Sequence, residues 1–74
     1  MKHKLDQRFM MHKINNEQLP PTHIIAACTE YDEFKCLEYN KVENNYIITY
    51  FDGIDERNFR TKSTLGALRT YNEF

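Results

Sequence analysis

The fold depends on residues 59–71, which read FRTKSTLGALRTY. A strand ends in this stretch, and Thr61 or Ser63 can then cap the start of a helix. Beyond the cap, apolar residues recur at helical spacing, namely Leu65, Ala67, Leu68 and Tyr71 or Asn72. We therefore expect a C-terminal helix over 63–72 that closes a core over a sheet. Gly66 is expected to let this helix pack closely on the sheet.

The preceding segment, 22–61, is predicted to form an antiparallel sheet. Short runs rich in apolar, aromatic or β-branched residues are typical of strands, and they fall at 23–29, 34–42, 46–51 and 57–61. Asn44-Asn45 suits a two-residue hairpin turn, because Asn tolerates positive φ. This turn would place Tyr39 opposite Tyr50 and Val42 opposite Ile47.

Both faces of the predicted sheet carry apolar side chains. One face would hold Leu37, Tyr39, Ile48 and Tyr50, and the other would hold Val42, Ile47 and Phe51. A single C-terminal helix accounts for only one of these faces. The second face is therefore expected to stay open, as a site for a partner or for self-association.

Residues 1–19 are predicted to form an N-terminal helical arm. Two pairs of apolar residues lie four apart in a weak helix over 3–16, Leu5 with Phe9 and Met10 with Ile14. No N-cap residue is evident. Asn15-Asn16 is expected to end this helix, and Pro20-Pro21 to impose an extended break.

Length and composition narrow the class of protein. Seventy-four residues allow one domain, 1–74. The pattern predicts an α+β fold, a small three- to four-stranded antiparallel β-meander packed against the C-terminal helix, with a short N-terminal helix. No apolar run approaches the roughly 20 residues of a membrane span, and no signal peptide is visible. We expect a cytoplasmic protein with no membrane partner. Asn, Ile, Lys and Tyr are frequent and have AT-rich codons, which suggests an AT-rich genome such as that of a phage or mobile element as the source.

No group of residues has the spacing of a catalytic or metal site. Cys28 and Cys36 lie eight apart, whereas zinc-binding pairs are separated by about two to four residues, and His3, His12 and His23 form no ligand pair. If their strands pair, the two thiols could come close together. His23 and Cys28 are an odd number apart, so we expect them on opposite faces of one strand. We expect neither enzyme activity, nor a metal, nor a cofactor.

The tyrosines favour a binding role. We predict a small non-enzymatic protein that acts by protein–protein interaction, as an accessory protein or inhibitor. Tyr is enriched at protein interfaces, because it offers a large contact area at a low entropic cost. The predicted partner-binding residues are Tyr31, Tyr39, Tyr46 and Tyr50. The partner would be a host protein or a second copy of the chain, as in a homodimer.

A nucleic-acid-binding module is the alternative. Its phosphate contacts would be Lys2, Lys4, Arg8, Lys13, Arg57, Arg60, Lys62 and Arg69. The net charge of −1 argues against binding by overall electrostatics, so these cations would have to converge on one surface. The step Phe59–Lys62 with Ala67 resembles the arm-type DNA-binding module of phage-type tyrosine recombinases, which implies DNA binding. That family is typically basic and has a strand Trp, which this chain lacks. The order helix, strands, helix also resembles double-stranded-RNA-binding domains, but the dense Lys cluster of their second helix is missing.

Overall fold

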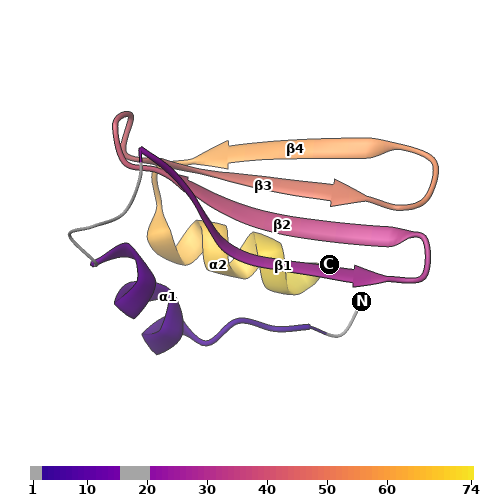
Figure 1. Ribbon diagram of the computed structural model, residues 1–74, viewed down its shortest axis with the longest axis horizontal. Helices are drawn as coiled ribbons and strands as arrows, with labels where there is room; N and C mark the ends of the chain where they lie inside the picture. The colour runs from indigo at the N-terminus through magenta and orange to yellow at the C-terminus, as the bar shows by residue number, and fades with distance from the viewer. Residues whose placement is uncertain (1–2, 16–20) are drawn as a thin grey trace.

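The computed structural model describes residues 3–15 and 21–74, in which a four-stranded sheet lies against two helices (Figure 1). The elements in chain order are α1 (Gln7–Ile14), β1 (Thr22–Glu30), β2 (Glu33–Asn40), β3 (Asn45–Phe51), β4 (Glu56–Thr61) and α2 (Thr64–Glu73). The strands are antiparallel and follow the order β1-β2-β3-β4. The predicted α+β meander with a C-terminal helix is therefore confirmed. The predictions for Lys2, Asn16 and Pro20 lie outside the described residues.

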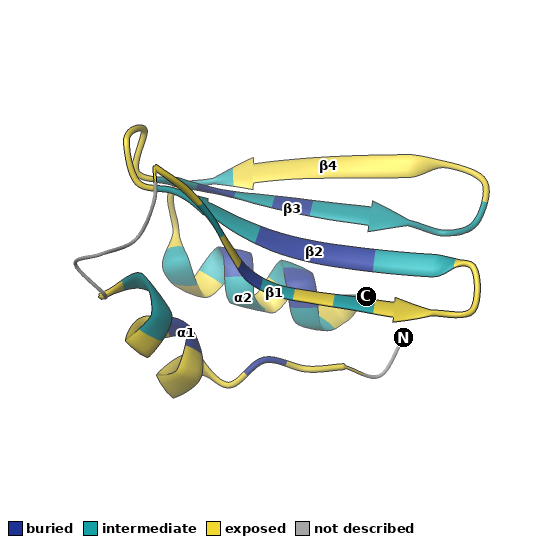
Figure 2. Cartoon of the chain, in the orientation of Figure 1, coloured by how far each residue is buried: buried dark blue, intermediate teal, exposed yellow. Residues whose placement is uncertain are grey.

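The two faces of the sheet differ in what covers them. α2 packs on β2, β3 and β4, and α1 contacts β1 and α2. Leu37 and Ile48 are fully buried on the helix-covered face, where burial is greatest in β2 (Figure 2). Ile47 and Phe51, which alternate with Ile48, lie on the opposite face, as predicted. No described helix packs on that opposite face, which we call the open face.

The β2–β3 hairpin has a longer turn than predicted. Tyr39 pairs with Tyr46 rather than with Tyr50, and the last pair is Asn40 with Asn45. The side chain of Asn40 accepts hydrogen bonds from the backbone of Val42 and Glu43, at 3.0 and 3.1 Å. This capped turn of residues 41–44 displaces the two-residue turn, and it leaves Val42 outside both strands. The register differs from the prediction by four residues, an even number, so the other side chains keep their predicted faces.

A β-bulge in β1 overturns another prediction. The pairing of β1 with β2 shifts between Ile24 and Ala26, which inserts Ile25 as an extra residue. Ile25 is 4% exposed and belongs to the core. Because of this insertion His23 and Cys28 lie on the same face, opposite Tyr39 and Lys35, rather than on opposite faces.

The N-terminal helix is shorter than predicted and has a cap. Asp6 is the N-cap, and its carboxylate accepts a hydrogen bond of 2.6 Å from the backbone N–H of Arg8. Residues 3–6 therefore precede the helix. Met10 is fully buried, whereas Phe9 is 46% exposed, so the expected pairing of Leu5 with Phe9 on one helix face is wrong.

The C-terminal helix is capped by Ser63, whose Oγ accepts a 3.0 Å hydrogen bond from the backbone N–H of Gly66. A Cβ on Gly66 would lie 3.1 Å from that Oγ, so this glycine makes room for the cap rather than for the sheet. Ala67 and Tyr71 are fully buried, while Leu65 is 52% exposed and lies outside the core. The core unites Leu5, which precedes α1, with residues from every element except β4, namely Met10, Ile25, Leu37, Tyr46, Ile48, Ala67 and Tyr71.

Candidate functional site

Lys35 is fully buried, although it carries a charge. Its Nζ donates to the backbone oxygen of His3 and, at 2.9 Å, to the backbone oxygen of Tyr71, and it lies 4.2 Å from the centre of the Tyr71 ring. Tyr71 is in the last turn of α2, where carbonyls lack intrahelical partners and the helix dipole favours a cation. Burial is the main cause that lowers the pKa of Lys35 from its ordinary 10.5. Lys35 therefore ties the sheet to the end of α2.

The segment before α1 is fastened to the same end of α2. The side chain of Asn72 accepts from the backbone N–H of Leu5 at 2.7 Å and donates to its carbonyl at 3.0 Å. The Tyr71 hydroxyl forms a hydrogen bond of 2.7 Å with His3 Nδ1. Burial raises the pKa of Tyr71 to about 12, so this hydroxyl keeps its proton at neutral pH. These contacts fasten the segment to the end of α2.

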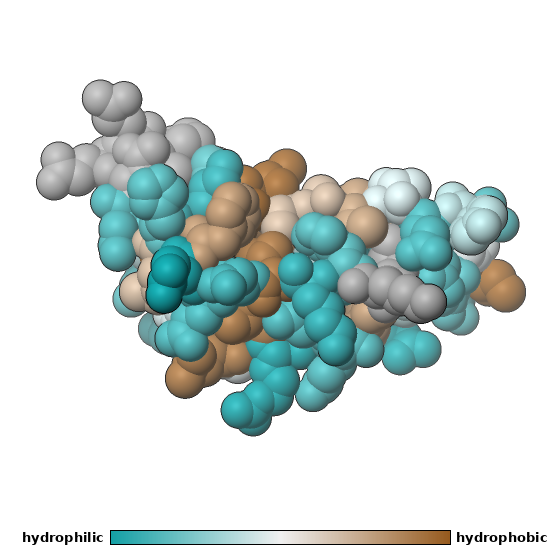
Figure 3. Space-filling view, turned by 90° about the horizontal axis from the view of Figure 1, so that it is seen from below, coloured by the Kyte–Doolittle hydropathy of each residue, from teal (hydrophilic) through white to brown (hydrophobic). Residues whose placement is uncertain are grey.

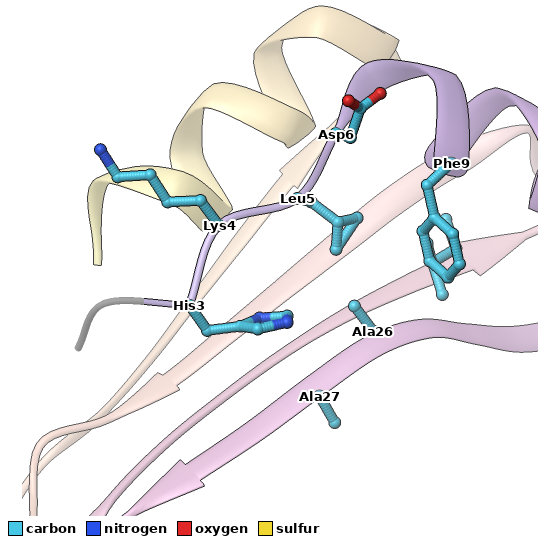
Figure 4. Close-up of a pocket in the computed structure, with 8 residues that line it drawn as sticks. His3, Lys4, Leu5, Asp6, Phe9, Ala26 and Ala27 are labelled. Atoms are coloured by element: carbon cyan, nitrogen blue, oxygen red, sulfur yellow. The ribbon is translucent and has the colours of Figure 1, made fainter.

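A groove of about 410 Å³ separates this N-terminal segment from the edge of β1. His3, Leu5 and Phe9 point toward the alanines of β1, whereas Lys4 and Asp6 point away (Figure 4). Hydrophobic residues form a band across the face that carries this segment (Figure 3). The groove has the volume of a ligand pocket, but charged groups do not converge in it. It offers no acid–base pair for catalysis among the described residues.

The two cysteines are free and lie on opposite faces of the sheet. Cys28 is opposite Lys35 on the helix-covered face, and Cys36 is opposite Ala27 on the open face. Burial raises the pKa of the Cys36 thiol to about 11, which opposes a nucleophilic thiolate. In the described ranges, no three His, Cys, Asp or Glu side chains gather as a metal site. Within the same ranges, no helix has the length and apolar character needed to cross a bilayer.

The four tyrosines predicted to bind a partner have different surroundings. Tyr46 is 3% exposed, and its hydroxyl hydrogen-bonds to Thr64 at the start of α2, at 2.8 Å. Tyr39 packs beside Tyr46, with ring centres 5.0 Å apart, and Tyr50 stacks on Phe74 at 4.3 Å. These three rings lie on the helix-covered face of the sheet, and Tyr46 belongs to the core. Tyr31 has 95% of its area exposed, whereas Tyr39 and Tyr50 are half-buried.

A second exposed apolar residue, Ile54, lies in the β3–β4 turn. The β1–β2 and β3–β4 turns sit at the same end of the sheet (Figure 1). They also touch, because a Cβ built on Gly53 would lie 3.3 Å from Cβ of Asp32. Ile54 is 86% exposed, and its turn is held by Asp52, whose carboxylate accepts from the backbone N–H groups of Ile54 and Asp55 at 2.9 and 2.8 Å.

Phe34 and Phe51 pair across β2 and β3 on the open face, directly inside these turns. Both side chains are half-buried. We call Tyr31, Phe34, Phe51 and Ile54 the turn-end surface. Ile54 was not predicted as a site residue, although it is an apolar residue in the polar run Asp52–Glu56. Lys35 was not predicted either, although its alternation with Leu37 places it on the core face.

The cations proposed to bind nucleic acid do not form one surface. Arg57 pairs with Tyr50 on the helix-covered side of β4, while Arg60 pairs with Ile47 on the open face. Lys4, Arg8 and Lys13 belong to the N-terminal segment and α1, which lie by the opposite edge strand, β1. Lys62 lies between β4 and α2, and Arg69 is exposed on α2. The convergence that the nucleic-acid alternative requires is therefore not met by the described residues.

Comparison with protein-family models, with curated proteins and with solved structures finds no match to this chain.

Proposed function

We propose that this chain is a small non-enzymatic binding protein that docks another protein on its turn-end surface. The observation that carries this proposal is the position of Tyr31. This large aromatic residue is 95% exposed, and its backbone has the left-handed conformation that suits Gly or Asn better than Tyr. An accessory protein or inhibitor of a phage or mobile element would act in this way. Two free thiols support a cytoplasmic site of action.

The backbone of Tyr31 has φ of 56°, in the left-handed region. An L-residue with a large side chain is disfavoured there, and Gly or Asn would relieve the strain. The ring forms no hydrogen bond or ring contact with the described residues that would compensate for this strain. Strained residues cluster at sites of recognition, and Tyr is among the residues that contribute most at protein interfaces. The strain and the exposure together support a contact with a partner.

Charge around the turn-end surface specifies the kind of partner. The two turns and the adjoining strand ends carry the carboxylates of Glu30, Asp32, Glu33, Asp52, Asp55 and Glu56. Phosphate groups would be repelled by this rim, so a protein fits better than a nucleic acid. An apolar centre with an acidic rim matches a protein surface that has an apolar pocket and basic residues around it.

Affinity capture from the native host tests the proposal. The immobilised wild-type chain is compared with a variant that combines Tyr31→Ser and Ile54→Ser, and captured proteins are identified by mass spectrometry. A Val42→Ser variant is the matched control, because Val42 is 78% exposed in the β2–β3 turn at the other end of the sheet. We expect a protein that the wild type and Val42→Ser retain and that the double variant loses. Equal capture by all three chains would contradict the assignment of this surface.

A further inference from the structure

β4 is an unpaired edge strand. It pairs with β3 on one side, in a continuous register from Tyr46 opposite Thr61 to Phe51 opposite Glu56. β4 is the most exposed strand of the sheet (Figure 2), and five of its six residues, Glu56–Arg60, are exposed. Its outer backbone N–H and C=O groups are therefore available to another strand. The other edge, β1, is interrupted by the bulge at Ile25 and flanked by the N-terminal segment, so β4 is the edge suited to pairing.

We propose that β4 pairs with β4 of a second copy of this chain, antiparallel and with Asn58 at the two-fold axis. The occupant of this edge is thus another copy, and the two four-stranded sheets join into one continuous sheet. Both α2 helices then lie on the same side, and the two open faces become continuous. This inference concerns a different surface from the turn-end surface and does not depend on the proposed function.

The order of residues along β4 selects this register. Residues directly opposite each other in an antiparallel pair point to the same face, so a two-fold axis must pass beside a residue, not between two. With Asn58 at the axis, Glu56 faces Arg60 of the second copy, and this pair occurs twice. Arg57 then faces Phe59 of the second copy, also twice, which is the geometry of a cation–π contact. Axes beside Arg57 or Arg60 would bring like charges together. An axis beside Phe59 would place both arginines opposite neutral polar residues, and it would set Glu56 opposite Lys62, which lies beyond the end of β4.

Glu56 and Arg60, which this register would set against each other, form no salt bridge within the described residues. Arg57 lies near enough to Asp52 to lower the pKa of that carboxyl group. Phe59 packs beside the ring of Phe74, with ring centres 5.6 Å apart, and is still 40% exposed. Charges on an edge strand ordinarily oppose pairing, but here the two-fold axis sets unlike charges against each other.

Asn58 can itself contribute at the axis. Thr49 donates to Asn58 Oδ1 at 3.0 Å, which leaves the amide N–H groups of Asn58 to face the second copy. The same hydrogen bond holds the Asn58 side chain in place before association. The amide oxygen of Asn58 keeps a second lone pair, so it can accept from the amide N–H of Asn58 in the second copy, and two neutral side chains bring no like charges together.

The contact is short, so the dimer is expected to be weak. A six-residue strand pair lies at the small end of interfaces between proteins. Sedimentation equilibrium over a concentration series should show association from the chain mass of 9.0 kDa to twice that value. High salt should weaken it, because the Glu56–Arg60 pairs lie near solvent.

Charge reversal provides the decisive test. Glu56→Arg alone and Arg60→Glu alone each set two pairs of like charges together, and each should weaken dimerisation about tenfold. A mixture of these two single variants should associate as a heterodimer. In that heterodimer the substituted position 56 of one chain faces the substituted position 60 of the other, with opposite charges. The unchanged Arg60 of the first chain then faces the unchanged Glu56 of the second.

The variant that carries both substitutions should dimerise like the wild type, because each pair keeps one positive and one negative member. Circular dichroism confirms that each exposed substitution leaves the fold intact. The proposal is overturned if the wild type stays at the mass of one chain, if single reversals leave the association unchanged, or if the mixture fails to associate.

The same variants distinguish the competing axis. An axis beside Phe59 would set position 56 opposite Lys62, so Glu56→Arg would meet a like charge there even when Arg60→Glu is also present. Neither the mixture nor the double substitution would then regain full affinity, and the register with Asn58 at the axis would be overturned. The capture experiment uses variants at Tyr31 and Ile54, whereas the dimerisation experiment uses variants at Glu56 and Arg60. The failure of one proposal can therefore be distinguished from the failure of the other.

Discussion

Asn44 and Tyr31 show how positive φ at a turn position favours some residue types over others. Asn44 and Tyr31 both have positive φ, at 54° and 56°. Asn is tolerated there, and Asn44 also accepts a 2.9 Å hydrogen bond from the hydroxyl of Tyr39. Tyr31 gains neither advantage, which is why we assign it to binding rather than to stability.

Replacing Tyr31 with Gly should therefore stabilise the protein. Gly adopts positive φ without a steric penalty, and the loss of a side chain that is 95% exposed removes little packing. We expect the free energy of unfolding in urea to rise by about 0.5–1 kcal/mol, after the entropy lost by Gly is subtracted. Val42→Gly, at an exposed turn residue without positive φ, should instead be neutral or destabilising. A loss of stability in Tyr31→Gly would mean that Tyr31 makes a stabilising contact.

At the scale of elements, the N-terminal segment is held by α2 rather than by its own helix. α1 has eight residues, too few for a stable isolated helix, and it buries only Met10 completely. The two hydrogen bonds between Asn72 and Leu5 therefore fix where the segment and α1 lie. The order of the elements along the chain does not reveal this attachment.

Asn72→Ala should release the segment while the sheet stays folded. Both backbone groups of Leu5 lose their partner, so we expect a loss of about 1–2 kcal/mol in stability and faster hydrogen exchange at the Leu5 amide. Exchange in β2 and β3 should change much less. Glu73→Ala, at the exposed neighbouring residue, is the matched control and should leave the Leu5 amide protected. Equal exchange at Leu5 in both variants would contradict this role of Asn72.

At the scale of the whole molecule, Lys35 joins three parts. From β2 it reaches the carbonyls of His3 and Tyr71, so the N-terminal segment, the sheet and the end of α2 meet at one ammonium group. This junction lies on the helix-covered face and leaves the open face without any described helix. The helix-covered face therefore holds the core, and both proposed contact surfaces lie away from it, at the turn end and on β4.

Lys35→Met should lower the free energy of unfolding by about 1–3 kcal/mol, because two carbonyls lose a donor that a thioether cannot replace. Lys41→Met, at an exposed turn residue, should change it by less than about 0.5 kcal/mol. Urea unfolding of the two variants measures this difference. Equal stability of the two variants would show that the Lys35 ammonium group does not hold the junction together.

The pH dependence gives an independent check on Lys35. Its pKa is lowered in the folded state, whereas the unfolded chain has the ordinary value of 10.5. Between those two values the unfolded chain binds more protons, so the contribution of Lys35 to stability rises with pH over that interval. The stability difference between the wild type and Lys35→Met should therefore grow as pH approaches 10.5. A difference that stays constant with pH would show that burial does not lower this pKa.

The α+β class and the strand order of the meander could be predicted from the sequence, as could the faces on which Leu37, Ile48, Ile47 and Phe51 lie. Such features follow from local patterns, because alternation and helical spacing are properties of neighbouring residues. The predicted hairpin register was wrong by four residues, but the predicted faces were correct. A shift by an even number of residues changes the cross-strand partners and leaves each side chain on the same face.

Contacts between residues far apart in the sequence could not be predicted and are known from the folded structure alone. The bulge at Ile25 depends on how β1 fits the core, and it reversed the expected relation of His23 and Cys28. The burial of Lys35, the hydrogen bonds from Asn72 and the contact between the two turns at one end of the sheet all join residues far apart in sequence. These contacts form because the core must be closely packed and buried polar groups must be hydrogen-bonded. Both requirements depend on the whole fold and leave no periodic pattern in the sequence.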